Sequence, residues 1–280
     1  MTTNAVELSG IVKKYGSQTV LDGLDLAIPR GSAYALLGNN GAGKSTAIRL
    51  ITGQLQPDAG NVEALGFDPV RQPVPFRLRL GYVPEAEKLY DFLTPPELFR
   101  FLKGFFPDWN DCRAAELMKR FALPADRKIS VFSRGMYAKV CLITVLARTP
   151  ELVILDDPTL GLDTVSRREF LSAIIESIQE YEHTLIISSH LIPELESICD
   201  HAGILSGGRM RCSAPVDQLK TEFRRIRLPD RNLPQLPGEL CRTVAAGELC
   251  IVVRNSADGF PPDAAVEPMT LEEIFLSLTQ

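Results

Sequence analysis

The chain has 280 residues, of which 45% are hydrophobic and 23% charged, and this length and composition suit one large globular domain or one domain with an appendix. Its formal net charge of −5 gives no broad basic field, so binding to nucleic acid through electrostatic attraction is not expected. The first 17 residues lack the pattern of a secretory signal, and no apolar run approaches the about 18 residues that span a membrane.

The first strongly patterned segment predicts a strand, a phosphate-binding loop and a helix. Ser32–Leu37 is a short, nearly all-apolar run, which is typical of a strand buried on both faces. A loop with the pattern G-x-x-x-x-G-K-S follows, and Thr46–Ile51 continues from it as the predicted helix. The loop residues are Gly38, Asn39, Asn40, Gly41, Ala42, Gly43, Lys44, Ser45 and Thr46. A glycine-rich turn that matches by chance is the alternative, but the strand and the helix stand in the required order.

The residues of this loop predict how a nucleoside triphosphate would bind. Glycines at both ends let backbone N–H groups surround the β- and γ-phosphates at the positive N-terminus of a helix. We expect Lys44 to contact the phosphate oxygens and Ser45 to place its hydroxyl on Mg²⁺. The sequence shows no motif of the N-K-x-D type that reads guanine, which favours ATP over GTP.

Between Glu85 and Pro150 the pattern changes from short apolar strands to helical periodicity. Thr94–Glu97 is a capping box with proline at the first helical position, and a second helix is predicted over Cys112–Phe121. Seven aromatic residues gather in this segment: Tyr90, Phe92, Phe99, Phe101, Phe105, Phe106 and Trp109. Local core packing accounts for some of them. They are more than one small helix can bury, so part of this surface is predicted to receive a partner.

Leu152–Pro158 consists of four apolar residues, two carboxylates and a proline. This pattern predicts a buried parallel strand that delivers acidic side chains at its carboxyl end. We expect Asp156 to bind Mg²⁺ directly or through water. Asp157 would stand beside the γ-phosphate, where a carboxylate can orient the attacking water. A strand that merely ends in an Asp-Pro turn is the alternative, and the phosphate-binding loop argues against it.

The C-terminal part of the chain continues with short strands. Thr184–Ser189 predicts another buried strand, and His201–Cys212 predicts a hairpin, with a short helix from Pro193 to Cys199 between them. Near residue 215 the character of the sequence changes, because prolines become frequent beyond it. Strand-like runs follow at Arg224–Leu228 and Leu249–Val253.

The chain closes with a predicted amphipathic helix. Thr270–Glu273 is a second capping box, and the apolar residues after it recur at i, i+3, i+4 and i+7. These residues are Leu271, Ile274, Phe275 and Leu278. We expect this helix to pack against the body of its own chain.

In this order the motifs resemble the nucleotide-binding subunit of an ATP-binding-cassette (ABC) transporter, and the resemblance covers the chain from about residue 5 to residue 215. Tyr15 stands where this family has an aromatic residue that stacks on adenine, although packing is an equally common role for such a tyrosine. Glu85 stands where most members have glutamine, in the loop that joins the metal site to the helical subdomain, and its carboxylate can hold water or Mg²⁺. His190 matches the switch histidine of the family, which contacts the γ-phosphate or the attacking water; a hydrogen-bonded structural histidine is the alternative.

Phe132–Met136 resembles the signature pentapeptide of the family, and it keeps Ser133 and Gly135 while three other positions differ. Leu160–Asp163 matches the loop after the acidic strand. In the family the signature completes the ATP site of a partner packed head to tail, so the resemblance implies a homodimer or a pair with a closely related ATPase subunit. At the start of a predicted helix, the Ser133 hydroxyl and the Gly135 N–H would form a second anion-binding site. An ordinary helix cap by Ser133 is the alternative.

One departure from the family concerns the rate of hydrolysis. Asp157 replaces the usual glutamate and shortens the reach of the carboxylate by about 1.5 Å. Because a displacement of about 1 Å can lower a rate on the order of 10²-fold, we expect slow hydrolysis unless the backbone compensates.

The resemblance implies an α/β fold of the P-loop NTPase (RecA-like) type, with a mainly parallel sheet, an antiparallel β-element near the N-terminus and an inserted α-helical subdomain. We expect the ATPase domain over residues 1–215, with its helical subdomain at about 86–149. A small C-terminal α+β extension would cover residues 216–280.

The implied function is the binding and hydrolysis of ATP, with Mg²⁺, to drive transport through separate integral membrane subunits. The protein would then lie on the cytoplasmic face of the membrane, attached through those subunits. Its C-terminal helix resembles that of ATPase subunits of drug, antibiotic and polysaccharide exporters. Two alternatives remain: a soluble ABC ATPase that acts as a switch outside transport, and a regulatory nucleotide-binding module with little turnover.

Overall fold

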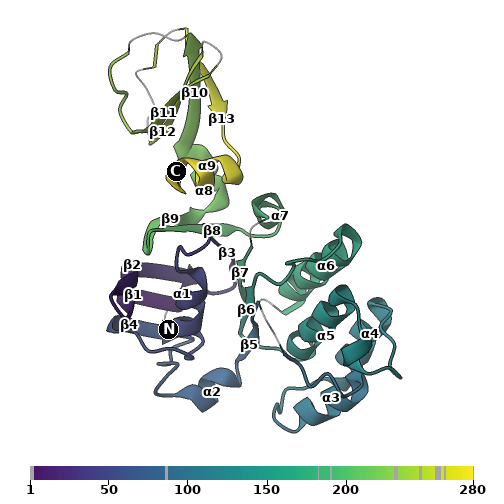
Figure 1. The fold of residues 1–280 in the computed structure, drawn as a ribbon. Coiled ribbons are helices and arrows are strands. Elements are labelled where there is room, and N and C mark those ends of the chain that lie inside the picture. Colours follow the sequence, from purple (N-terminus) through teal and green to yellow (C-terminus); the bar gives the residue numbers. More distant parts are fainter. Residues whose placement is uncertain are drawn as a thin grey trace.

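The β-strands of the described residues form three sheets in the computed structural model (Figure 1). The structure describes residues 3–85, 88–181, 183–189, 191–229, 233–245, 248–255, 260–261 and 263–279. Among these residues, no helix combines the length and the apolar character needed to cross a membrane.

The central sheet holds the strands that the sequence predicts to be buried. Its strand order is β5 (Leu80–Val83), β6 (Leu152–Asp156), β7 (Thr184–Ser188), β3 (Ala33–Gly38), β8 (His201–Ser206) and β9 (Arg209–Pro215). Neighbouring strands from β5 to β8 pair in parallel, whereas β9 at the edge is antiparallel to β8. Every residue of β3, β6 and β7 is buried, which explains their continuous apolar runs. Both the mainly parallel sheet and the predicted hairpin are therefore confirmed.

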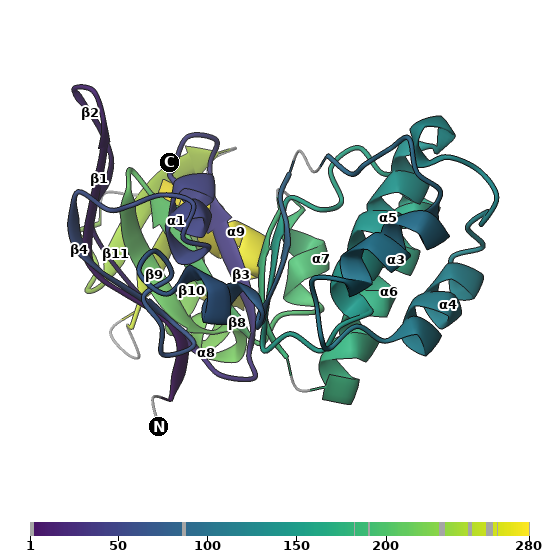
Figure 2. The same cartoon turned by 90° about the horizontal axis from the view of Figure 1, so that it is seen from below.

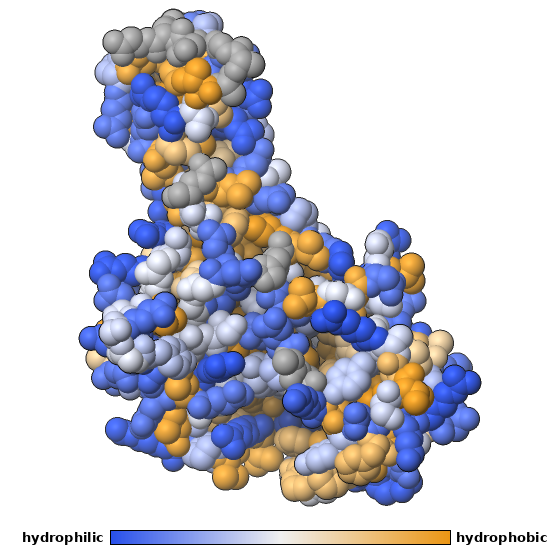
Figure 3. All heavy atoms as spheres, viewed as in Figure 1, coloured by the Kyte–Doolittle hydropathy of each residue, from blue (hydrophilic) through white to orange (hydrophobic). Residues whose placement is uncertain are grey.

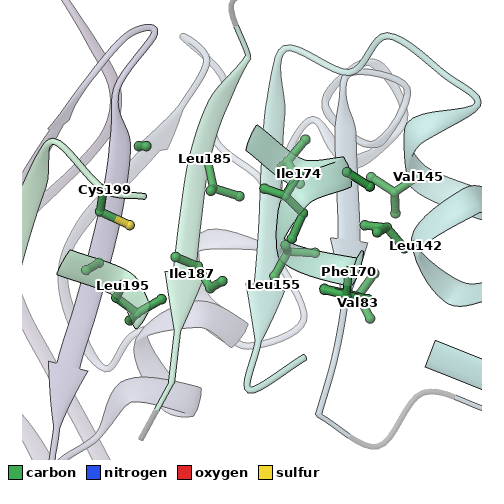
Figure 4. Packing of buried hydrophobic residues seen from close by; sticks show 14 of the residues in the cluster. Val83, Leu142, Val145, Leu155, Phe170, Ile174, Leu185, Ile187, Leu195 and Cys199 are labelled. Carbon is green, nitrogen blue, oxygen red and sulfur yellow. The ribbon is translucent and has the colours of Figure 1, made fainter. Parts of the chain in front are cut away.

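The central sheet separates two hydrophobic clusters. Alternate residues of β3 point to opposite faces, so that Leu37 belongs to one cluster and Leu36 to the other. On the face of Leu37, helices α5 (Arg134–Leu146) and α6 (Thr164–Tyr181) cover the sheet. Figure 4 shows Leu155 of β6 and Phe170 of α6 in this cluster. Because both faces of the sheet are covered, its carboxyl edge is the part of the sheet that remains open to a ligand.

On the other face lies an antiparallel sheet, as predicted for the N-terminal part of the chain. Its strand order is β2 (Gln18–Pro29), β1 (Asn4–Tyr15) and β4 (Ala59–Ala64). Helix α1 (Lys44–Ile51) packs between this sheet and the central one, and the short helix α2 (Pro73–Arg77) leads into β5. Figure 2 shows β1, β2, β4 and α1 on one side of the molecule and helices α3 to α6 on the other.

The segment between β5 and β6 is helical, as predicted. It contains α3 (Pro95–Lys103), α4 (Asp111–Arg120), the 3₁₀ turn η1 (Ile129–Val131) and α5. The capping box at the start of α3 is confirmed, because the Thr94 backbone N–H donates to Oε2 of Glu97 at 2.8 Å. Ion pairs from Lys139 to Glu169 and from Arg120 to Glu176 join this helical subdomain to α6.

Helix α7 (Ile192–Glu196) precedes the hairpin of β8 and β9. After this hairpin the chain forms a smaller α+β unit. It contains α8 (Val216–Glu222) and α9 (Leu271–Thr279), and a third sheet of strand order β11 (Glu239–Ala245), β12 (Glu248–Arg254), β10 (Phe223–Pro229) and β13 (Ala265–Pro268). Residues on one face of this sheet, such as Ile226 and Ile251, form a separate small core. Helix α9 begins with the predicted capping box of Thr270 and Glu273 and buries Leu271, as expected for packing on its own chain.

Candidate nucleotide-binding site

The phosphate-binding loop connects β3 to α1 at the carboxyl edge of the central sheet. Gly43 has a φ of +108°, and a Cβ atom placed on it would lie 2.6 Å from Cδ2 of Leu21. Any other residue would therefore be strained and would collide with the antiparallel sheet. Gly43 is also the N-cap of α1, and within this fully described segment no side chain caps the helix and no acidic residue occupies its first turn. The first amides of α1 and the positive end of its dipole are thus available to an anion.

Lys44 is 7% exposed and lies inside the loop that precedes it. Its ammonium group donates to the carbonyl oxygen of Gly38 at 2.7 Å and to that of Asn39 at 3.4 Å. Burial lowers the pKa of Lys44 from its ordinary value, and the negative charges of Asp157, Asp156 and Glu85 oppose this effect. A triphosphate placed beside Lys44 would add further negative charge and would favour the ammonium form.

The two predicted acids stand at the end of β6. Asp156 and Asp157 are 5% and 8% exposed, respectively. The Ser188 hydroxyl of β7 donates to Oδ1 of Asp156 at 2.6 Å, and it accepts a hydrogen bond from the backbone N–H of Asp157 at 3.0 Å. Asp157 has a φ of +46°, a left-handed conformation that aspartate tolerates better than most residues. The chain therefore turns sharply where the second carboxylate leaves the sheet.

A cavity of about 340 Å³ brings most of the predicted nucleotide site together. It is lined by Gln18, Val20, Asn39, Asn40, Gly41, Gly43, Lys44, Ser45, Thr46, Glu85 and Asp157. The loop residues and two carboxylates from distant parts of the sequence thus face one space. Such a space can hold phosphate groups between a helix N-terminus and a candidate base for water.

The chemistry of this site fits Mg²⁺ bound together with a nucleotide. In the described part of the chain, no group of three or more His, Cys, Asp or Glu side chains could hold a metal alone. Mg²⁺, however, usually binds through one or two carboxylates and the phosphates of its substrate, so a closed protein cage is not needed. Asp156 and Ser45 would be the protein ligands, with Glu85 at the open side. Mg²⁺ would neutralise negative charge on the phosphates as it develops.

The signature residues lie at the start of α5. The Ser133 hydroxyl accepts a hydrogen bond from the Met136 N–H at 3.2 Å, so it caps its own helix, as the alternative interpretation expects. A Cβ atom on Gly135 would lie 2.6 Å from Oγ of Ser166, which explains the glycine at this position. Ser133 and Gly135 do not line the cavity of the phosphate-binding loop. A neighbouring cavity of about 250 Å³ contains Arg134 together with Glu85 and Asp157.

Two of the predicted site residues that the structure describes, Tyr15 and Asp156, do not line the cavity. Tyr15 is 46% exposed at the end of β1, close in sequence to Gln18 of the cavity wall, but it does not line the cavity. His190 lies outside the described residues, so its predicted role as a switch stays a prediction.

Sequence reasoning assigned no role to several residues at the site. Gln18 and Val20 of β2 line the cavity, and Ser188 bonds both acids. Ser188 carried a signal that could have revealed it, because it is the hydroxyl residue at the carboxyl end of a buried strand. Asn39 also donates from Nδ2 to the carbonyl of Thr279 in α9 at 3.4 Å, a contact across the whole length of the chain that no local pattern indicates.

A third cavity lies between β5 and the helical subdomain. It measures about 360 Å³, and its walls include Tyr82 of β5, Leu102 and Arg148. Beside it, four exposed aromatic residues form an aromatic patch: Tyr90, Phe92, Phe101 and Phe105. The ring centroid of Phe101 lies 5.3 Å from that of Tyr90 and 5.0 Å from that of Phe105. Figure 3 shows apolar residues along the lower edge of the molecule, in the region that Figure 1 labels α2 and α3.

Comparison with known proteins agrees with the geometry of the site. Residues 21–160 match the family model described as "ABC transporter". The chain is 30% identical to the ABC transporter ATP-binding protein YtrB of Bacillus subtilis over 97% of each chain. It is 32% identical to the daunorubicin/doxorubicin resistance ATP-binding protein DrrA of Streptomyces peucetius, over 91% of this chain and 79% of that protein.

A third relative is the bacitracin transport ATP-binding protein BcrA of Bacillus licheniformis, which is 32% identical over 81% of this chain and 76% of its own length. Among solved structures, an ATP-binding subunit of an ABC transporter superposes with a TM-score of 0.70 at 29% identity. That likeness covers 78% of this chain and 92% of the other. The P-loop NTPase fold expected from the sequence is therefore confirmed.

Proposed function

Because the chain belongs to the ABC transporter family of ATP-binding proteins, we propose that it hydrolyses ATP to drive an exporter through separate membrane subunits. The observation that carries this proposal is the cavity in which the phosphate-binding loop, Glu85 and Asp157 face one another. Support for export comes from the relatives DrrA and BcrA, whose names describe drug resistance and bacitracin transport.

Each residue of the site has a proposed part in hydrolysis. The loop amides and Lys44 bind the β- and γ-phosphates, and Ser45 and Asp156 hold Mg²⁺. Asp157 orients the attacking water and accepts its proton, while Glu85 holds water or Mg²⁺ from the open side. Tyr15 stacks on adenine. His190 contacts the γ-phosphate or that water.

We further propose that two copies, or this chain and a closely related ATPase subunit, close over two ATP molecules. The position of Ser133 and Gly135 supports this arrangement, because neither lines the cavity of its own chain. A partner packed head to tail would bring the N-terminus of its α5 to the γ-phosphate, where exposed Ser133 could exchange its bond to Met136 for one to phosphate.

The cavity beside β5 and the aromatic patch are the proposed docking site for a cytoplasmic helix of the membrane subunit. This site borders Glu85 of the nucleotide cavity through β5, so motion at one site can reach the other. The protein would accordingly lie on the cytoplasmic face of the membrane, held by its partner. We place the boundary between the ATPase domain and the C-terminal extension near residue 215, where β9 ends and α8 begins.

The test is phosphate release by the full chain in vesicles that contain its membrane subunits. We expect Mg²⁺-dependent ATP turnover that Lys44→Ala abolishes, whereas Lys220→Ala, which removes an ammonium group that pairs with Glu196 and does not line the nucleotide cavity, leaves it unchanged. ATP binding without turnover would favour a regulatory module. Recovery of active protein that cross-links to no membrane subunit in cells would favour a soluble switch outside transport.

A further inference from the structure

Ser188 is the last residue of β7 and has no part in the scheme above. The parallel register of β6 and β7 places it directly beside Asp156. It is 0% exposed, so water does not compete for its hydroxyl. A buried hydroxyl that bonds the carboxylate of Asp156 and the backbone N–H of Asp157 has strong effects on both groups, because hydrogen bonds are electrostatically stronger away from water.

The directions of the hydrogen bonds follow from the atoms involved. The backbone N–H of Asp157 can only donate, so Oγ of Ser188 accepts from it at 3.0 Å. The single hydroxyl proton is then directed to Oδ1 of Asp156 at 2.6 Å, the length of a charge-assisted bond to a carboxylate. One hydroxyl therefore fixes the rotation of the first carboxylate and, at the same time, the backbone that carries the second.

The backbone at Asp157 needs such support. A non-glycine residue in the left-handed region costs on the order of 1–3 kcal/mol and persists where its surroundings over-determine it. The N–H of Asp157 donates to two atoms of Ser188, Oγ at 3.0 Å and the carbonyl oxygen at 3.1 Å. When the hydroxyl is removed, the carbonyl bond remains for Asp157, but Asp156 loses the donor to Oδ1.

We propose that Ser188 is a positioning residue of the hydrolysis site, which orients Asp156 toward Mg²⁺ and secures the turn that presents Asp157 to the nucleotide cavity. The inference rests on the proposed function for the roles of the two acids. It goes further in predicting that the two acids are affected unequally. The loss of the hydroxyl weakens metal binding by Asp156 more than it disturbs Asp157, because Asp157 keeps its bond to the carbonyl oxygen of Ser188.

Four variants separate this role from simple packing. Ser188→Ala removes the hydroxyl. Ser188→Thr keeps the hydroxyl, and Ser188→Val has the shape of threonine without it, so this pair differs in the hydrogen bonds alone. The control is Ser177→Ala in α6, since Ser177 is also buried and its hydroxyl has no hydrogen-bond partner among the described residues.

The first readout is the binding of Mn²⁺, as a probe for Mg²⁺, to the protein with a non-hydrolysable ATP analogue, followed by electron paramagnetic resonance. Loss of a residue that orients a metal ligand typically weakens metal affinity or activity by about 10–100-fold. We expect a loss of that size in Ser188→Ala and Ser188→Val, recovery in Ser188→Thr relative to Ser188→Val, and wild-type affinity in Ser177→Ala. Binding of the analogue without metal should stay close to that of the wild type.

The second readout is phosphate release by the complex with its membrane subunits. We expect kcat to fall in Ser188→Ala and Ser188→Val, with little change in the KM for ATP. If Ser188→Ala and Ser188→Val match the wild type in Mn²⁺ affinity, the inference is wrong even if the wild type hydrolyses ATP. Equal loss of affinity in the threonine and valine variants would also overturn it, because shape alone would then explain the effect. If the wild-type complex shows no turnover, the proposed function fails, and the Mn²⁺ measurement still decides the role of Ser188.

Discussion

Replacement of Asp157 by asparagine tests the proposed chemistry with little disturbance of the fold. Asparagine has nearly the same shape as aspartate and tolerates the φ of +46° at this position. The backbone bonds of residue 157 to Ser188 do not involve its side chain, so the turn should persist. The carboxylate charge is therefore the main property that changes.

The size of the effect follows from the proposed role. A positioned base contributes on the order of 10²–10⁴-fold, which corresponds to about 3–5 kcal/mol of the activation barrier. ATP binding should not weaken, because a negative charge beside the phosphates disappears. The Asp157 carboxylate also raises the pKa of Lys44, and asparagine removes this effect. The negative charge of a bound triphosphate acts on Lys44 in the same direction and takes its place.

The assay is single-turnover hydrolysis in the complex, together with the ATP dissociation constant from a fluorescent analogue. Asp22→Asn is a suitable control, because Asp22 is an exposed aspartate whose carboxylate pairs with Arg209 on the surface. We expect a slow chemical step with ATP binding retained in Asp157→Asn, and wild-type behaviour in the control. An unchanged single-turnover rate in Asp157→Asn would refute the role of this carboxylate.

Three further predictions concern dimer closure, helix capping and alkaline stability. Gly135→Ala places a Cβ atom 2.6 Å from Oγ of Ser166, so it should abolish ATP-dependent dimerisation in analytical ultracentrifugation while each chain still binds ATP. Thr94→Ala removes a capping box worth about 1 kcal/mol and should lower the Tm by roughly 2–4 °C in a thermal melt, with Thr94→Ser near the wild type. Burial raises the pKa of Cys212 from 9.0 to about 11, so the unfolded chain loses this proton first and the stability from the buried thiol should decline between pH 9 and 11. Chemical denaturation at several pH values should show a shallower decline in Cys212→Ala; an equal slope would contradict the assignment.

The sequence predicts best those elements whose local pattern has one physical explanation. Ser32–Leu37, Leu152–Asp156 and Thr184–Ser188 are apolar except at their ends because both faces of the central sheet are covered, and all three form strands as expected. The two capping boxes likewise require only residues close in sequence. The short helix predicted from Pro193 to Cys199 is shorter, since α7 ends at Glu196.

Elements stabilised by distant partners were harder to foresee. Strands β11 and β13 form only through pairing with β12 and β10, and exposed residues such as Leu240 and Val244 give β11 no clear apolar alternation. Four exposed aromatic rings in the patch agree with the expectation that the segment has too many to bury. No sequence pattern could have indicated whether these four or Phe99 and Trp109 would enter the core, because that depends on how α3 and α5 meet.

The left-handed turn at Asp157 bears on the question of its short side chain. A glutamate on an ordinary strand end and an aspartate on a turned backbone can bring a carboxylate to similar places, since the backbone supplies part of the reach. Asp157 lines the nucleotide cavity together with the loop, and Ser188 holds its backbone from the neighbouring strand. The shorter side chain and the hydrogen bond to Ser188 of β7 thus act together, and the position of the Asp157 carboxylate is set by the main chain more than by the side chain. Hydrolysis should therefore depend more strongly on Ser188 here than in a protein that carries glutamate at the end of the acidic strand.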